Sequence, residues 1–512
     1  MRKRRIKILL KLLLASFALL VAFLLFERVR GQISLARYRR QLAAQGEKLT
    51  SQELGATAAR GENGAPEVLA ALERLKKGAV LPDHYPPRMK LTSSGRAIVG
   101  FHELEWIDDK VTNRWEQLAA DLKANEATLR EIRSALKKPV LNNHVDWSQG
   151  MKMQFPHLAP AKSLTYWFGS ASQLALHEGR TREALEYLLV EVGLPRLLSE
   201  DRLLISELVR IAIGAIGRTD TWEALQAEGW TDEDLAALQK AWATQDFANG
   251  MARSLEGERV FDDASYAMMR DSHQDAVGGL FGLEELFDAD ASDRPAWEKF
   301  MRELPYGGEI ADFLQKQVYA RIWRFAWSHQ AQRQSMEVMQ RLIEIARKAA
   351  AEKSFASVRD DLTRLDERVL AKNLYDKLRY PNPQSIFTLS RAVARASWAE
   401  VDRSMTICAI ALKRYSLRHG KLPPQLDVLV PEFLSSVPTD YLDGQPMRYH
   451  LNSDGSFTLY SVGENGKDDG GDVSPLPDKS TTRNLRDRKD YVWPAPALPE
   501  EIEAYRQEAT KN

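Results

Sequence analysis

Cysteine is almost absent from this sequence: Cys408 is the only one in 512 residues. A single thiol excludes an intramolecular disulfide framework and any cysteine-rich metal site. Cys408 lies within the apolar run MTICAIAL, where a cysteine usually packs as a small hydrophobic side chain. We therefore expect it to be buried and unreactive.

An excess of charge of either sign is also absent, because 71 Lys and Arg residues balance 71 Asp and Glu residues. A chain without a basic field is not expected to bind nucleic acid. Hydrophobic residues make up 44% and charged residues 28% of the chain. This is an ordinary globular composition, which argues against wholesale disorder. The length predicts two to four domains.

Familiar catalytic motifs are missing as well. The sequence contains no phosphate-binding glycine loop, no G-x-S-x-G elbow and no H-E-x-x-H helix. We therefore predict a non-enzymatic protein without a small-molecule substrate. The alternative is a hydrolase of the cell envelope whose site is built from dispersed residues, with His144, Asp146 and His157 as candidates, since His and Asp are common acid–base groups. A structural role for these three residues is the interpretation that we favour.

The longest apolar run lies at the N-terminus. Residues 12–26 contain no charge, and counting from Ile8 across Lys11 gives roughly one bilayer-spanning helix. We predict an uncleaved signal anchor. The alternative is a cleavable signal peptide, whose apolar core would be shorter and would end at a small-x-small site, whereas this run ends in FLLFERVRG.

Positive charge flanks this run on both sides. Six basic residues precede or enter it, namely Arg2, Lys3, Arg4, Arg5, Lys7 and Lys11. Five follow it, namely Arg28, Arg30, Arg37, Arg39 and Arg40. The larger number on the N-terminal side predicts a cytoplasmic N-terminus, with the remaining chain outside the cytoplasm.

Apolar spacing in the rest of the chain predicts a mostly α-helical protein, an irregular helical bundle or solenoid. From Asn113, apolar residues recur at intervals of three, four and seven, which places them on one helical face. We predict the following segments: a cytoplasmic tip and transmembrane anchor over 1–30, a helical stalk and connector over 31–112, a helical domain over 113–395 with a possible internal boundary near 288–309, an α+β module over 396–493, and a tail over 494–512.

Several local patterns give more specific predictions. Thr231 and Asp234 form a near capping box at a helix start, and Ser199 is a candidate cap for the helix that follows it. A short helix from Glu67 is expected to stop at Gly78. Residues 167–195 resemble a tetratricopeptide-type helical hairpin, without a reliable second repeat.

The C-terminal part changes from helical to strand-like patterns. The runs MRYHL and SFTLYSV flank the turn Ser453-Asp454-Gly455, which predicts a β-hairpin. The loop GENGKDDGGD follows directly. A long helix followed by a small antiparallel sheet is therefore expected here.

These residues resemble a known family. Over 403–493 the chain is similar to the globular part of the major pseudopilin of bacterial type II secretion systems, in the ordered segments RYSLRHGKLP, LDVLV, VPTDYLDGQPMRY, FTLYSVGENGKDDGG and DYVW. The whole chain also resembles a family of uncharacterised membrane-anchored bacterial proteins, through GENGAP, DWSQG, FPHLAPAKSL and LLISELVRIAI.

The pseudopilin resemblance implies a calcium site. Asn465 and Asp490 match acidic positions of that family's calcium loop, and further oxygens would come from the acidic residues and a carbonyl nearby. The resulting ligand set is Val462 (carbonyl), Asn465, Asp468, Asp469, Asp472 and Asp490. Flexible Asp- and Asn-rich loops supply the hard oxygens that calcium requires. The alternative is a solvated Asn-Gly and Asp-Gly turn that needs no ion.

The N-terminus departs from the pseudopilin pattern. A pseudopilin has a processing site directly before its hydrophobic helix, and LKLLLASFALL offers none. We therefore expect not a processed pilus subunit but a single-pass protein of the bacterial inner membrane, with most of the chain on the periplasmic side. Its expected role is that of a scaffold or accessory that contacts protein partners, with a link to a type II secretion-like system.

Overall fold

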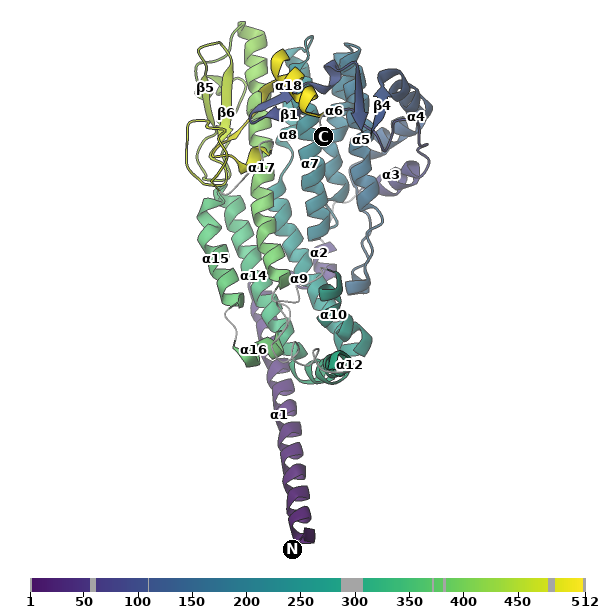
Figure 1. The fold of residues 1–512 in the computed structure, drawn as a ribbon, viewed down its shortest axis with the longest axis vertical. Helices are drawn as coiled ribbons and strands as arrows, with labels where there is room; N and C mark the ends of the chain where they lie inside the picture. The colour runs from purple at the N-terminus through teal and green to yellow at the C-terminus, as the bar shows by residue number, and fades with distance from the viewer. Residues whose placement is uncertain are drawn as a thin grey trace.

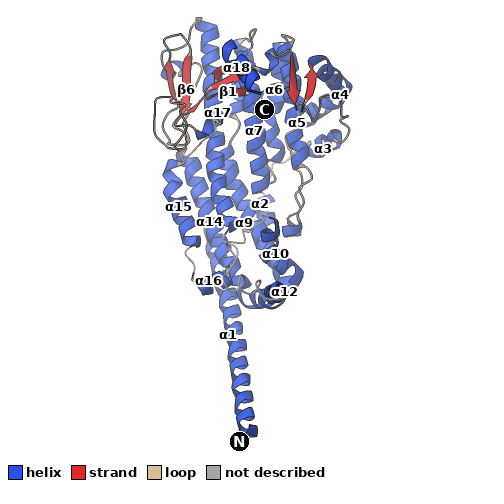
Figure 2. Cartoon of the chain, viewed as in Figure 1, coloured by secondary structure: helices blue, strands red, loops and turns tan. Residues whose placement is uncertain are grey.

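The computed structural model describes residues 2–55, 61–108, 110–286, 307–370, 373–380, 384–477 and 484–509. It is 67% helical. An elongated helical body has one long helix, α1, projecting from one end, and the small sheets gather at the opposite end (Figures 1 and 2). The mostly α-helical prediction, with a long apolar N-terminal helix and small antiparallel sheets, is confirmed. The solenoid arrangement and the pseudopilin likeness stay predictions.

The predicted anchor and the first part of the predicted stalk form a single helix, α1 (Arg2–Ala44). Among the described residues, α1 is the one helix long and apolar enough to cross a membrane, and none of its most apolar stretch is buried in the protein. Its C-terminal half is different, because Leu35 and Leu42 pack against Met336 of α14 (Ser328–Glu352). The helix stops before Gly46, whose φ of +82° suits glycine.

The body is built from helices that lie largely along its long axis (Figure 1). The part farther from the N-terminus contains α3 (Ala65–Leu72), α4 (Trp115–Leu136), α5 (Leu158–His177), α6 (Thr181–Gly193), α7 (Leu204–Gln226), α8 (Asp232–Ala243) and α18 (Pro499–Ala509). The part nearer α1 contains α2 (Ser51–Gly55), α9 (Phe247–Asp271), α10 (His273–Leu286), α12 (Gly307–Phe313), α13 (Ala320–Ile322), α15 (Ala356–Leu370) and α16 (Leu374–Arg379). The long helix α17 (Gln384–His419) runs through both parts.

Short helical turns connect these elements. The 3-10 turns are η1 (Gly100–His102), η2 (Trp147–Lys152), η3 (Leu194–Leu198), η7 (Leu426–Leu429) and η8 (Leu485–Asp487). Two π-helical segments, η5 (Leu314–Tyr319) and η6 (Trp323–Trp327), continue from α12 into α14. Trp323 and Trp327 are both buried in one hydrophobic cluster, where they act as packing anchors between helices.

Three small sheets complete the fold of the described residues. The predicted hairpin is confirmed as β5 (Arg448–Leu451) and β6 (Phe457–Ser461), and β7 (Tyr491–Val492) adds a third antiparallel strand. The other two sheets were not predicted. They consist of β1 (Lys90–Ser93), β2 (Arg96–Ile98) and β8 (Ala495–Pro496), with β2 parallel to β8, and of the antiparallel pair β3 (Glu105–Asp108) and β4 (Val111–Arg114).

The helical hairpin at α5 and α6 and the capping box of α8 are confirmed. Gly179 takes a φ of +71° at the turn between α5 and α6, and Ala184 is fully buried. Thr231 Oγ1 accepts the N–H of Asp234, and the Asp234 carboxylate accepts the N–H of Thr231. These predictions hold because each depends only on residues a few positions apart.

Two predicted helix limits are wrong. The short helix ends at Leu72 rather than Gly78, because Asn125 of α4 accepts the N–H of Lys76 and donates to the Lys76 carbonyl oxygen, so these backbone groups pair with α4 and not within a helix. Ser199 does not cap α7, which begins at Leu204. The Leu204 N–H is accepted instead by a carboxylate from a distant helix, Glu258 of α9.

The predicted segment limits are not decided by the structure. The helix α17 runs without a break across the predicted limit between 395 and 396. The predicted internal boundary near 288–309 lies mostly outside the described residues, since 287–306 are not described. Cys408 is completely buried, as expected, and burial raises the pKa of its thiol.

Candidate functional site

Asp490 is the organising residue of the glycine-rich loop. Its buried carboxylate accepts the N–H of Gly471 at 2.7 Å and that of Asp472 at 3.0 Å, with the N–H of Asp469 at 3.4 Å. Burial raises the pKa of Asp490, and these backbone donors act in the opposite direction. The carboxylate therefore holds the loop against the strand β7, which begins at the next residue.

The other acidic side chains of the loop have partners within the protein. Asp468 accepts from Arg448 Nε at 2.9 Å and from the Tyr460 hydroxyl at 3.0 Å. Asp472 pairs with Lys489 Nζ at 2.8 Å, and this contact is the main reason that the pKa of Asp472 is lowered to about 2. Two basic side chains thus neutralise carboxylates that were candidate calcium ligands.

The remaining candidate ligands also make hydrogen bonds within the protein. Asn465 Nδ2 donates to Asp469 Oδ2 at 2.8 Å. Val462 is buried, and its N–H donates to Asp440. Within the described part of the chain, no group of three or more His, Cys, Asp or Glu side chains is arranged to hold a metal ion.

The donor set in this arrangement does not fit calcium, which takes six to eight oxygens around one point. Binding would require the ion pairs of Asp468 with Arg448 and of Asp472 with Lys489 to open. The interpretation as a turn without an ion accounts for each contact of the loop. Calcium binding stays a prediction.

Sequence reasoning missed Asp440, the most connected acid of this module. Its fully buried carboxylate accepts from Arg448 Nη1, Ser461 Oγ and the backbone N–H groups of Leu442 and Val462. The pKa of Asp440 is raised by burial. The only signal in the sequence is an aspartate inside the apolar segment VPTDYL.

The three residues of the hydrolase alternative make separate contacts. His144 Nε2 lies 3.2 Å from Asn63 Nδ2, and Asp146 accepts from Ser148 and Gln149. His157 Nε2 lies 2.7 Å from Asp201 Oδ2, and both residues are buried. No described hydrogen bond joins His144, Asp146 and His157 to one another. The His157–Asp201 pair instead fixes the connector before α5 to the start of α7.

The contact between α1 and α14 is a second candidate site, and sequence reasoning missed it. Glu27 is buried, although it directly follows the apolar run of α1. Gln330 Nε2 of α14 donates to both the carboxylate and the carbonyl oxygen of Glu27, each at 2.9 Å. Arg30 donates to Glu27 at 2.9 Å and to Gln330 at 3.0 Å. This polar cluster fixes the anchor helix to the body.

Gly31 makes the close approach of the two helices possible. A Cβ at this position would lie 2.9 Å from Gln330 Cγ and 3.2 Å from His329 Cβ. Glu27, Gly31 and Leu35 follow one another at four-residue intervals on the buried face of α1. That interval is the signal in the sequence by which this face could have been found.

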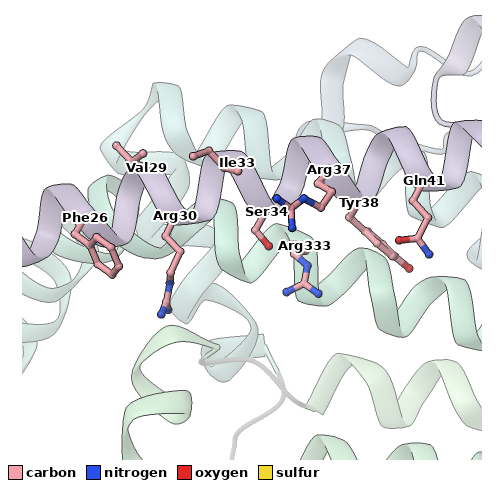
Figure 3. Close-up of a pocket in the computed structure, with 9 residues that line it drawn as sticks. All are labelled: Phe26, Val29, Arg30, Ile33, Ser34, Arg37, Tyr38, Gln41 and Arg333. Atoms are coloured by element: carbon pink, nitrogen blue, oxygen red, sulfur yellow. The ribbon is translucent and has the colours of Figure 1, made fainter.

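An open groove of about 450 Å³ runs along a neighbouring flank of α1 (Figure 3). Its lining combines exposed apolar side chains, Phe26, Val29 and Ile33, with cationic ones, Arg30, Arg37 and Arg333. Ser34, Tyr38 and Gln41 complete it. The groove therefore begins where the apolar run of α1 ends and continues along the body.

No family model, no curated protein and no solved structure matches this chain. The likeness to the type II pseudopilin stays an interpretation of the sequence segments that suggested it.

Proposed function

We propose that this protein is a non-enzymatic, single-pass protein of the bacterial inner membrane that acts by binding other proteins on the periplasmic side. The main support is the construction of α1. One uninterrupted helix of 43 residues combines an apolar half that the body does not cover with a half that is fixed to α14. Such a helix holds the body at a set position above the membrane.

The groove along α1 supports a role in protein binding. Phe26, Val29 and Ile33 expose 60%, 50% and 57% of their surfaces at its edge. An apolar stripe at helical spacing beside cationic side chains suits an amphipathic helix with acidic residues. We therefore propose this groove as the contact site for a partner.

The proposed role is that of a scaffold or accessory beside a secretion or envelope machine. The link to a type II secretion-like system rests on the resemblance of residues 403–493 to the major pseudopilin. A processed secretion subunit would lack part of the N-terminus. The intact mass of the membrane-extracted protein distinguishes these cases, and we expect the mass of the full chain.

The test of protein binding is photo-crosslinking in living cells. A photoreactive amino acid is placed at Ile33 in the groove or at Glu228, an exposed control position far from it. We expect a discrete protein adduct from Ile33 alone, identified by mass spectrometry, which is lost when Arg37→Glu and Arg333→Glu are added.

Two outcomes would contradict the proposal. Equal adducts from Ile33 and Glu228 would show that the groove has no selective partner. An adduct that is insensitive to both charge reversals would show that the cationic side chains do not contribute to recognition.

A further inference from the structure

We propose that the end of the body from which α1 projects is itself a lipid-binding surface. The surface, here called the membrane-end ledge, consists of the exposed apolar side chains of Ile310, Phe313, Leu314, Val318 and Phe325. The inference rests on the proposed membrane anchoring by α1, and it adds a second contact with the bilayer. Figure 1 shows α12 beside the point where α1 leaves the body.

The level of the ledge follows from its contacts with α1. Ile8 to Phe26 is about 19 residues, or about 28 Å of helix, which matches the hydrocarbon thickness of a bilayer. Phe23 lies near the end of this stretch, and its ring centroid is 6.4 Å from that of Tyr375. Leu24 packs against the hydrophobic cluster that contains Trp323 and Trp327. These parts of the body must therefore lie at the bilayer surface.

The contacts of Phe325 with α1 also place the ledge at the bilayer surface. Arg28, two residues beyond the apolar run, donates through Nη1 to the Phe325 carbonyl at 3.3 Å. The Arg28 guanidinium carbon also lies 4.8 Å from the centre of the Phe325 ring. An arginine at the end of a span is expected among lipid headgroups, so the Phe325 ring belongs to the interfacial region.

The ledge side chains are exposed although they are large and apolar. Ile310, Phe313 and Leu314 expose 47%, 60% and 41% of their surfaces, and Val318 and Phe325 expose 41% each. Ile310, Phe313 or Leu314, and Val318 are spaced as on one helical face, while Ala311 and Ala320 are fully buried. The described residues leave this face uncovered, and a headgroup–acyl boundary would cover it.

Two aromatic residues behind the ledge fix it to the body. Trp323 Nε1 donates to the Arg379 carbonyl at 2.9 Å, and the Tyr319 hydroxyl donates to the Leu378 carbonyl at 2.7 Å. These bonds fix the ledge to α16. Arg321 and Arg324 in the same segment suit anionic headgroups.

The test uses the full chain reconstituted in vesicles of phosphatidylethanolamine and phosphatidylglycerol. Because Cys408 is completely buried, a new surface cysteine can be labelled selectively with a fluorophore. The labelled positions are Phe313→Cys and Val318→Cys in the ledge, Leu19→Cys in the span, and Leu451→Cys in β5 at the far end of the body. Quenching is measured with nitroxide lipids and with aqueous iodide.

We expect nitroxide lipids to quench the Leu19, Phe313 and Val318 labels several-fold more than the Leu451 label, and iodide to give the reverse order. If the ledge labels behave like Leu451 while the Leu19 label is still quenched by lipid, the anchor stands and the ledge proposal is wrong. Protection of the ledge labels from both quenchers would show that protein covers the ledge, which also overturns the proposal. A Leu19 label that lipid does not quench would contradict the anchoring itself.

Discussion

At the scale of single residues, buried acids set how stability depends on pH. Glu223 of α7 is fully buried and accepts the N–H groups of Met89 at 2.7 Å and Gly100 at 2.9 Å. Burial outweighs these bonds and raises the pKa of Glu223 from 4.5 to about 8. Between these values the folded chain keeps a proton that the unfolded chain has lost, so stability falls as pH rises through this range.

The substitution Glu223→Gln should remove this dependence. The amide keeps an acceptor for the backbone N–H groups but does not titrate. Each unit of pKa shift corresponds to about 1.4 kcal/mol, so we expect the variant to gain up to a few kcal/mol relative to the unchanged protein between pH 5 and 8. Melting temperatures in detergent, followed by tryptophan fluorescence across this range, measure the difference.

A matched control is Glu228→Gln, at an exposed position just beyond α7. Its melting temperature should equal that of the unchanged protein at every pH. If the melting temperature of Glu223→Gln depends on pH in the same way as that of the unchanged protein, Glu223 is ionised in the folded state and its proposed effect is wrong.

Asp490 permits a separate test of the calcium hypothesis. Asp490→Ala leaves three backbone donors of the glycine-rich loop without their acceptor, and each such loss costs about 1–3 kcal/mol. We therefore expect a lower melting temperature for this variant even in the presence of a chelator. A ligand that binds only the folded state must also raise the melting temperature.

If the loop binds calcium, the unchanged protein should melt at a higher temperature in calcium than in chelator, and Asp490→Ala should abolish the difference. If the unchanged protein melts at the same temperature in calcium and in chelator, Arg448 and Lys489 alone neutralise the carboxylates of the loop. Asp454→Ala is the control, because Asp454 accepts the Ser456 N–H in the exposed β5–β6 turn, outside the glycine-rich loop. It should shift the melts in calcium and in chelator equally and leave the difference between them unchanged.

At the scale of elements, the packing of α1 on α14 depends on Gly31. A methyl group there would meet Gln330, whose side chain is held by Glu27 and Arg30 and cannot move away freely. We expect Gly31→Ala to destabilise the protein by about 1–3 kcal/mol through overpacking. Thermal melting together with protease sensitivity near residue 45 would detect the loosened helix.

Gly278→Ala is the matched control, because Gly278 is also helical and a Cβ there would have nothing within 4 Å. Helix propensity alone predicts a gain of up to about 1 kcal/mol for it. A similar gain for Gly31→Ala would show that α1 and α14 do not approach each other as closely as described.

The distance along the chain between interacting residues explains which elements of the fold could be predicted from the sequence. The capping box of Thr231 and the β5–β6 hairpin depend on neighbouring residues, so their patterns are visible locally. The parallel pairing of β2 with β8 joins Arg96 to Ala495 and Ala97 to Pro496, which lie about 400 residues apart along the chain. No local pattern indicates such a pair, and strands of two or three residues give little alternation to detect.

The burial of polar side chains explains the other features that could not be predicted from the sequence. In α7, Glu207 and Arg210 are buried, where they pair with each other, although charged side chains are normally expected at the surface. In the glycine-rich loop the acidic residues could be found from composition. Their pairing with Arg448, from β5, and with Lys489 is a tertiary property, and it decides whether the loop can accept an ion.

At the scale of the whole molecule, α1 couples the predicted topology to the position of the body. If the basic N-terminus is cytoplasmic and α1 crosses the membrane, the body, the groove and the ledge all lie on the side of the membrane away from the cytoplasm. Because Cys408 is buried, the protein offers no native thiol to a surface reagent, and single added cysteines can report the side of the membrane directly.

We predict that Leu451→Cys reacts with a membrane-impermeant maleimide in intact spheroplasts. Ile6→Cys, before the span, should react only after lysis, and it leaves every basic residue of the N-terminus in place. Both positions are exposed, at 43% and 60%, so neither result can be attributed to burial within the protein. The opposite labelling pattern would place the body in the cytoplasm. In that case the positive charges after the span, including Arg28 and Arg30, would have determined the orientation in place of those before it.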